Sequence, residues 1–148
     1  MSLALPLNIP QIKELIPHRY PFLLIDQVTA FESGKWIQTR RNISYADPIF
    51  QGHFPTDPVY PGVYLIEGLA QSGAALFKLS SAQTSEVRET LLTQVSKVRF
   101  RKKVVPGDVL FYEVTLAKSK SEFYWFEGVV KDEAGKLVCE ASFSAILR

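Results

Sequence analysis

The sequence predicts an α+β fold in which an antiparallel sheet of about six strands wraps around one long central helix. Residues 62–79 are apolar nearly all round, interrupted by Glu67, Gln71 and Ser72, and this pattern indicates a buried helix. Segments with strand-like alternation lie on both sides of this helix, two before it and four after it. At 148 residues and 47% hydrophobic content, the chain fits one domain that spans residues 1–148.

The first expected elements are a short helix and a hairpin. Asn8 is a typical capping residue, and the apolar stripe that follows it stops at Pro17, so a short helix is expected between them. Residues 22–31 and 36–43 are rich in β-branched and aromatic side chains, and the turn-forming residues 32–35 separate them. These two segments are therefore expected to pair as antiparallel strands.

A long loop leads into the central helix, and four strands follow that helix. Residues 44–61 contain four prolines and no sustained hydrophobic period, which is typical of an ordered loop. Loops of this length are usually functional. After a polar stretch at 80–89, the chain alternates in strand fashion to its end. The expected strands are 91–100, 109–117, 123–131 and 137–147.

Composition excludes several classes of protein. The 17 basic and 15 acidic residues leave a net charge of +2, which is too balanced for binding nucleic acid through long-range electrostatics. The one cysteine, Cys139, excludes an intrachain disulfide framework and a zinc site of clustered thiolates, so a reducing cytoplasm is expected. Glu67 and Gln71 argue against a membrane span in the central helix. The N-terminus lacks a secretory leader, and residues 1–3 are compatible with a remnant of an expression vector.

Two side chains suited to acid–base chemistry flank a proline-rich segment. His53 lies in the long loop, and histidine is the residue type best suited to accept a proton near neutral pH. Glu67 lies in the apolar helix, where burial is expected to raise its pKa and keep it protonated as an acid. Taken separately, a loop histidine is ordinarily structural and a helical glutamate ordinarily faces solvent. The prolines between them restrict the backbone and favour a preorganised site.

The start of the central helix supplies a third group. The first N–H groups of a helix have no internal partners, and Gly62, which follows Pro61, lets a ligand approach them closely. A thioester carbonyl placed there would have its enolate-like charge stabilised by these donors. A Pro–Gly pair also simply begins a helix, and by itself it does not distinguish the two interpretations.

Three ordered motifs resemble those of the Z-type β-hydroxyacyl-acyl carrier protein dehydratases of type II fatty acid synthesis, which have the hot-dog fold. They are LIPHRYPFLLID at 15–26; GHFP at 52–55, PGV at 61–63 and EGLAQ at 67–71; and VRFRK at 98–102 with VPGD at 105–108. The resemblance runs nearly end to end. It implies dehydration of a (3R)-3-hydroxyacyl thioester on acyl carrier protein to the trans-2-enoyl product, in fatty acid or related polyene or polyketide-type lipid synthesis.

The resemblance also implies roles for individual residues. His53 removes the α proton and Glu67 protonates the departing 3-hydroxyl, with no metal and no organic cofactor. Glutamate at position 67, where the related A-type dehydratase/isomerases have aspartate, favours plain dehydration. The resemblance further implies a homodimer in which His53 meets Glu67 of the partner subunit, and trimers of such dimers. The other expected contributions are the carbonyl of Val59 facing His53, the N–H of Gly62 for the thioester oxygen, Gln71 orienting Glu67, and His18 at the border of the site, with a purely structural role as the alternative.

The chain departs from the Z-type pattern beside the site. Tyr60 stands where that pattern usually has Met, Tyr64 where it has Leu, and Gly68 where it has Ala. Two bulky rings would shorten an acyl tunnel or favour flat, conjugated or aryl-bearing chains.

Acyl carrier protein is acidic, so its docking surface on the enzyme is expected to be basic. A charged strand edge that resists aggregation is the alternative explanation of a basic run. The densest such run is Arg99, Arg101, Lys102 and Lys103, with Arg40 and Arg41 as a second candidate.

Two other functions would use the same features. A hot-dog acyl thioesterase would use the carboxylate to activate water against the carbonyl. A non-catalytic acyl-binding module would need no chemistry, because fold alone does not establish activity. The loop histidine paired with a helical glutamate favours elimination over both.

Overall fold

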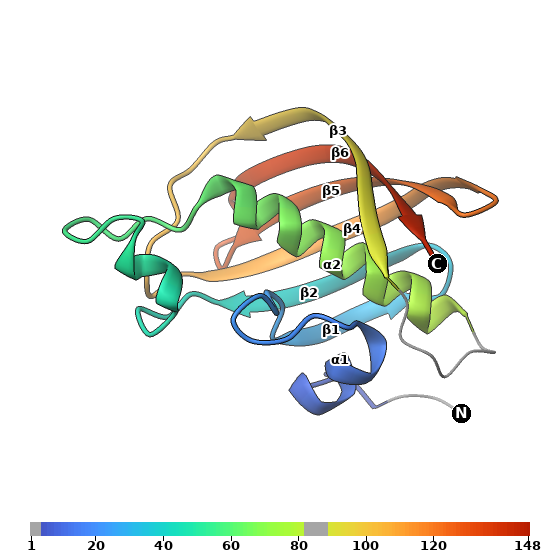
Figure 1. The fold of residues 1–148 in the computed structure, drawn as a ribbon, viewed down its shortest axis with the longest axis horizontal. Coiled ribbons are helices and arrows are strands. Elements are labelled where there is room, and N and C mark those ends of the chain that lie inside the picture. Colours follow the sequence, from blue (N-terminus) through green and yellow to red (C-terminus); the bar gives the residue numbers. More distant parts are fainter. Residues whose placement is uncertain (1–3, 82–88) are drawn as a thin grey trace.

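The computed structural model describes residues 4–81 and 89–148, which form a six-stranded antiparallel sheet curved around a long helix (Figure 1). Residues 1–3 and most of the polar stretch expected at 80–89 lie outside the described residues. The elements are α1 (Ile9–Leu15), β1 (Gln27–Glu32), β2 (Trp36–Asn42), the 3-10 helix η1 (Pro48–Gln51), α2 (Gly62–Ser80), β3 (Thr90–Phe100), β4 (Val109–Lys120), β5 (Phe123–Asp132) and β6 (Leu137–Leu147). The predicted α+β hot-dog architecture is confirmed.

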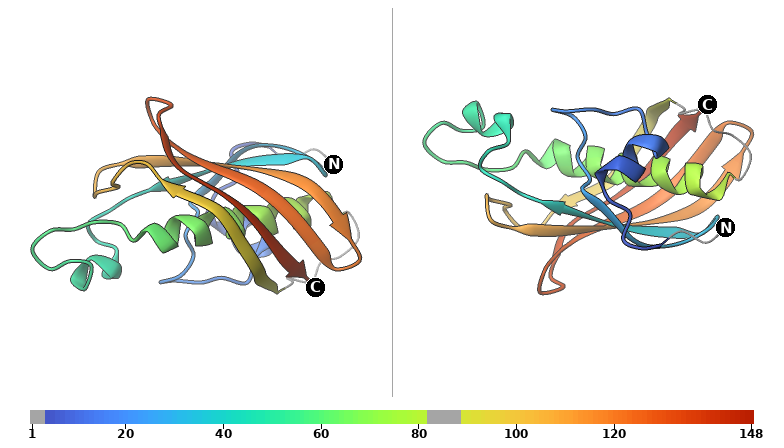
Figure 2. Two further views of the ribbon diagram at one scale, coloured as in Figure 1. Left: turned by 90° about the horizontal axis from the view of Figure 1, so that it is seen from above. Right: turned by 90° about the horizontal axis from the view of Figure 1, so that it is seen from below.

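The strand order of the sheet is β1-β2-β4-β5-β6-β3. The chain therefore leaves β2 at one side, runs along α2 across the concave face, and returns as β3 at the opposite edge, beside β6 (Figure 2). Strands β4, β5 and β6 then fill the space between by hairpin connections. This order places one long edge strand, β3, next to the helix that carries Glu67.

Helix α2 is buried against the sheet, as its apolar pattern predicts. Leu65, Leu69 and Leu76 are 2% exposed or less and belong to the same core cluster as the strand residues beneath them. Burying a leucine side chain contributes about 2 kcal/mol, so this face accounts for much of the stability of the helix. The polar Ser72 is satisfied inside the core, because its hydroxyl donates to the carbonyl of Gly68 at 2.8 Å. Within the described ranges, no helix is long and apolar enough to cross a membrane.

The strand expected at residues 22–31 is wrong in its first half, since β1 begins only at Gln27. The side-chain amide of Gln71 occupies the backbone groups that a strand there would have used. Its oxygen accepts from the N–H of Leu24 and its nitrogen donates to the carbonyl of Phe22, both at 2.8 Å. A contact 47 residues away in sequence thus competes with strand pairing. The other predicted helices and strands are confirmed to within three residues of their predicted ends.

Candidate active site

His53 is fixed in the loop between β2 and α2 by its backbone and by its ring. Its N–H donates to the carbonyl of Ile49 and its carbonyl accepts from the N–H of Val59, each at 3.1 Å. The ring nitrogen Nδ1 lies 2.6 Å from the carbonyl oxygen of Val59, and the ring stacks on Phe54 with centroids 4.0 Å apart. A carbonyl oxygen can only accept, so Nδ1 carries the hydrogen. In the neutral ring the other nitrogen, Nε2, then carries the lone pair and can act as a base.

A partly buried arginine ties this loop to the sheet. Asp47 caps η1 by accepting from the N–H of Ile49 through Oδ1 at 2.9 Å. Its other oxygen, Oδ2, pairs with Nη2 of Arg41 at 2.8 Å, and Nη1 of Arg41 lies 3.3 Å from Asp26. The Arg41 side chain is only 13% exposed. The loop that carries His53 is thus held at its start by charge-assisted hydrogen bonds.

Arg41 is consequently unavailable for docking a carrier protein, and its inclusion in the second candidate surface is wrong. The signal was present in the sequence, because Ile37 and Thr39 alternate with solvent-facing residues on β2 and Arg41 is next in the inward register. Arg40, which faces the other way, bonds to Asn42 and lies over the ring of Phe111 at 5.9 Å.

Glu67 lies in the second turn of α2, with its side chain 20% exposed. Burial raises the pKa of its carboxyl group, and a hydrogen bond from Nε2 of Gln71 to Oε1 at 3.2 Å partly offsets this rise. Gln71 is itself fully buried and is held by the backbone of the preceding segment. The net effect is a carboxyl group that stays protonated to a higher pH than a free glutamic acid does.

His18 lies beside Glu67 and not beside His53. Its Nε2 atom is 3.6 Å from Oε1 of Glu67. Burial lowers the pKa of His18, and the neighbouring charge of Arg19 lowers it further. The two side chains share a cavity of about 260 Å³ with Gln71, Ala70 and residues 90–92 of β3.

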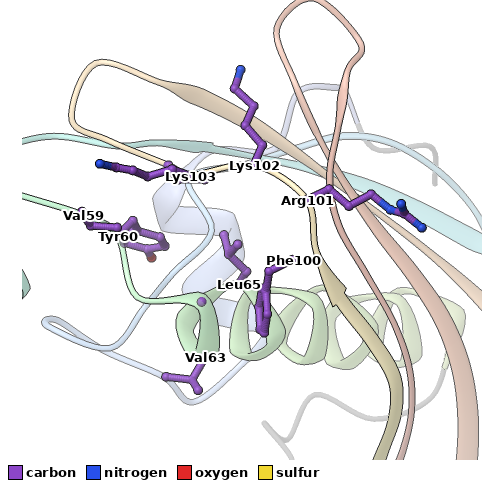
Figure 3. Close-up of a pocket in the computed structure, with 10 residues that line it drawn as sticks. Val59, Tyr60, Val63, Leu65, Phe100, Arg101, Lys102 and Lys103 are labelled. Carbon is purple, nitrogen blue, oxygen red and sulfur yellow. The ribbon is translucent and has the colours of Figure 1, made fainter.

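The first turn of α2 faces a larger groove of about 600 Å³, whose walls include Val59, Gly62 and Phe100 (Figure 3). The ring of Phe100 lies over this turn, and a Cβ atom at position 62 would lie 2.8 Å from its Cε1 atom. Glycine is therefore required there if the ring keeps its place. In this turn the N–H of Tyr64 donates to the carbonyl of Pro61 at 3.0 Å. The N–H groups of Gly62 and Val63 precede any carbonyl of the helix that they could reach, so they are suited to an oxyanion or a carbonyl oxygen. Sequence reasoning did not single out Phe100.

The two aromatic departures from the Z-type pattern are directed into the protein. Tyr60 is 2% exposed, and its ring contacts Phe50 and Tyr64 with centroids 6.2 and 5.6 Å away. Burial raises the pKa of its hydroxyl to about 12. The ring of Tyr64 is partly buried and lies edge-on to Phe22 at 5.8 Å. The effect of these rings on an acyl tunnel stays a prediction.

The basic run borders the groove and is exposed. Arg101 pairs with Glu140 at 3.0 Å, Lys102 with Asp132 at 2.5 Å, and Lys103 more loosely with Asp57 at 3.9 Å. Figure 3 shows the side chains of Arg101 and Lys102 directed away from the groove. Arg99, on β3, is also exposed. Arg101, Lys102 and Lys103 line the groove at the first turn of α2, and Arg99 lies next to that lining along the chain. These four residues are called the positive rim below.

The predicted base and the predicted acid do not meet within one chain. Among the described residues, no hydrogen bond or ion pair joins His53 to Glu67, and neither of the two cavities described above has both in its lining. The structure brings Glu67 together with Gln71 and His18, and His53 together with Val59.

A curved antiparallel sheet around a buried helix defines this chain as a hot-dog protein, and it carries a loop histidine and a helical glutamate. The family model described as a FabA-like domain matches residues 16–142. The chain therefore belongs to the FabA-like family.

Two known proteins resemble the chain over nearly its whole length, and a third resembles it over 80%. The 3-hydroxyacyl-[acyl-carrier-protein] dehydratase FabZ of Aliarcobacter butzleri is 44% identical over 144 residues, which cover 95% of this chain and 97% of the relative. The dehydratase heterocomplex ApeI:P of Xenorhabdus doucetiae has a similar structure, with a TM-score of 0.78 and 20% identity over 99% of this chain and 93% of the other. A hypothetical thioesterase of Streptococcus pneumoniae with coenzyme A shares the fold at a TM-score of 0.59 and 15% identity, covering 80% of this chain and 82% of the other.

Proposed function

We propose that this chain dehydrates (3R)-3-hydroxyacyl thioesters on acyl carrier protein to trans-2-enoyl thioesters, with His53 as the base and Glu67 as the acid. The observation that carries the proposal is that the same chain holds a histidine bound to a carbonyl through Nδ1, with Nε2 left free, and a buried carboxyl group of raised pKa. A ring nitrogen with a free lone pair can take a proton and a carboxyl group of raised pKa can give one, as acid–base elimination requires. The FabZ relative at 44% identity bears the name of this reaction.

The reaction follows from these roles. Nε2 of His53 takes the proton from C2 of the acyl chain, and the electrons of that C–H bond form the C2–C3 double bond. The C3–O bond breaks, and Glu67 gives its proton to the departing hydroxyl, which leaves as water. The negative charge that develops on the thioester oxygen is stabilised by the N–H of Gly62 at the positive end of α2. This chemistry needs no metal and no organic cofactor.

A homodimer is the assembly that would complete this site, and edge strand β3 supports it. In the described part of the sheet, β3 pairs only with β6, which leaves its outer edge free. Long apolar edge strands tend to pair with another chain. The exposed apolar side chains on this strand are Leu91, Leu92, Val95 and Phe100.

A partner seated on β3 would lie next to both halves of the site, because β3 borders both cavities. Thr90, Leu91 and Leu92 line the cavity of Glu67, and Phe100 lines the groove at Gly62. His53 of the partner subunit would then face Glu67 across the interface. We place trimers of such dimers and a cytoplasmic location in the same proposal, on the resemblance alone.

The positive rim of Arg99, Arg101, Lys102 and Lys103 is the proposed docking surface for acyl carrier protein. It lies at the mouth of the groove at Gly62, where the thioester would enter. Opposite charge steers such partners together and fixes their orientation. The flat, conjugated or aryl-bearing acyl chains suggested by Tyr60 and Tyr64 belong to the same proposal, as a preference among substrates.

The test is an assay with 3-hydroxyacyl thioesters on carrier protein in which the 2-enoyl product is followed by mass and free thiol is followed in parallel. Enoyl product from the wild type, lost in His53→Ala and in Glu67→Gln, is the expected result. Free thiol without enoyl product would make the chain a thioesterase, consistent with the fold it shares with the Streptococcus pneumoniae protein. Neither product, across saturated, polyenoyl and aryl chains, would indicate a binding module.

A further inference from the structure

His18 has contacts that the acid–base pair alone does not explain. Its Nε2 atom lies 3.6 Å from Oε1 of Glu67, and Nε2 of Gln71 donates to the same oxygen at 3.2 Å. Two nitrogen atoms from different parts of the chain thus converge on one carboxyl oxygen. None of the residues in the described ranges bonds to the other oxygen, Oε2.

The segment that carries His18 is tied firmly to α2. Gln71 donates to the carbonyl of Phe22 at 2.8 Å, and the His18 ring lies against the Phe22 ring with centroids 6.4 Å apart. Nη1 of Arg19 donates to the carbonyl of His18 at 2.7 Å, which also fixes the backbone. The amide of Gln71 is thus held by the backbone of this segment, and the imidazole of His18 reaches Glu67 from the same segment.

We propose that His18 is a positioning residue for Glu67. The amide of Gln71 holds Oε1 by a hydrogen bond, and Nε2–H of His18, just beyond hydrogen-bonding distance at 3.6 Å, closes on the same oxygen as its charge develops, so that Oε2 is presented to the departing 3-hydroxyl group. The inference rests on the proposed function, in which Glu67 protonates that hydroxyl. When the proton leaves Oε2, the new carboxylate keeps both donors on Oε1, so its charge is stabilised as it forms.

The electrostatics of the cavity suit a neutral donor. Burial, followed by the charge of Arg19, lowers the pKa of His18 and favours the uncharged ring at neutral pH. An imidazolium in its place would drive Glu67 to ionise, whereas a neutral ring does not. The other described residues that line the cavity are uncharged, namely Ala70, Gln71, Thr90, Leu91 and Leu92, so His18 is the one titratable group of this lining that faces Glu67.

Two substitutions of His18 test whether the donor at Nε2 matters apart from the rest of the imidazole ring. Glutamine places an amide nitrogen close to the position of histidine Nε2 and does not titrate, whereas asparagine is too short to reach it. We expect His18→Asn to lower kcat about 10- to 100-fold, the effect of losing a hydrogen bond to a charged group, with a much smaller change in KM. His18→Asn should also move the alkaline limb of the kcat profile to higher pH, because the carboxylate loses a donor that favours it over the acid. His18→Gln should restore most of kcat and the position of this limb.

The result that would overturn the proposal is a wild-type kcat and an unshifted limb in His18→Asn, or equal losses in both variants. Glu67→Gln is assayed beside them. If Glu67→Gln still dehydrates, the proposed function itself is wrong, whereas an inactive Glu67→Gln beside an unaffected His18→Asn overturns only the role of His18. A titration of the Glu67 side-chain carbon by NMR gives a readout without turnover. A higher Glu67 pKa in His18→Asn than in His18→Gln supports the positioning role, and equal values contradict it.

Discussion

Gly68 and Tyr112 are packed so closely that a Cβ atom at position 68 would lie 2.5 Å from Cζ of the tyrosine. Tyr112 lies on β4 and is fully buried. Its ring packs against α2 at Gly68, the residue that follows Glu67. The Z-type pattern usually has Ala at position 68. The structure explains this departure, because Ala and Tyr112 cannot both keep these positions.

Gly68→Ala is therefore predicted to lower the free energy of unfolding by about 1–3 kcal/mol, as expected for overpacking. This loss should appear although alanine favours a helix over glycine by about 1 kcal/mol. Urea denaturation measures it. Gly52→Ala is the matched control, since no atom lies within 4 Å of its added Cβ, and it should not be destabilised. In a double-mutant cycle, Tyr112→Leu should reduce the effect of Gly68→Ala, and strict additivity would contradict the pairing.

Mixing two inactive variants tests whether the site is shared between subunits. If His53 of one chain works with Glu67 of the partner subunit, a dimer of one His53→Ala chain and one Glu67→Gln chain has one intact site out of two. Equal mixing with free exchange makes about half of the dimers mixed, so about a quarter of wild-type activity is expected. Dehydratase activity after co-expression or reassociation is the measurement, and mixtures of each variant with itself are the controls. No recovery in dimers shown to be mixed would place each site within one chain.

Glu67 is predicted to make stability depend on pH. Its pKa is higher in the folded protein than in the unfolded chain, where it is about 4.3. Its contribution to stability is therefore complete below the unfolded value and is lost as the pH rises through the folded value. Glu67→Gln keeps a group that accepts from Gln71 and cannot ionise. It should be more stable than the wild type at about pH 8, and the gain should shrink as the pH falls towards about 4. Urea midpoints at several pH values check this, and a gain that does not change with pH would contradict it.

Arg41→Met is predicted to lower the free energy of unfolding by about 3 kcal/mol, because it leaves Asp26 and Asp47 without their partner. It should also lower kcat, since Asp47 caps the 3-10 helix that precedes His53. Arg101→Met is the control. Arg101 pairs with Glu140 while 47% exposed, and such surface pairs contribute less than about 1 kcal/mol. Similar losses in the two variants would show that Arg41 does not anchor the loop.

Charge reversal on the positive rim is predicted to affect carrier-bound substrates selectively. Arg101→Glu combined with Lys102→Glu should raise KM about 3- to 10-fold for a thioester on acyl carrier protein and leave KM for a pantetheine thioester nearly unchanged. The difference should shrink at high salt, because the charges are exposed. Lys118→Glu with Lys120→Glu, at the exposed far end of β4, is the control and should have little effect. An equal rise for both substrates would argue against docking at the rim.

Local patterns in the sequence were sufficient for most elements. The helix at 62–79 and the strands after it agree with the structure because periodicity, glycine–aspartate turns and proline positions act over a few residues. His53 and Glu67 also stand out locally, one in a proline-rich loop and one in an apolar helix. The roles of these two residues stay predictions until the variants are assayed.

Other features depend on contacts between distant parts of the chain. The segment 22–26 has the composition of a strand, yet the side chain of Gln71 bonds to the N–H of Leu24 and the carbonyl of Phe22. The sequence gives no reason for glycine at position 68, whereas the structure shows Tyr112 packed against it. Likewise, the sequence places His18 only at the border of the site, whereas the structure places it beside Glu67.

Neighbours along the chain are enough to predict which segments are helical or extended and which side chains are suited to proton transfer. The position of β3 at the edge of the described sheet, the inward direction of Arg41 and the separation of His53 from Glu67 within one chain depend instead on the folded structure. These outcomes follow from how the sheet packs around α2. That packing balances burial and hydrogen bonding over the whole domain, and no short stretch of sequence contains it.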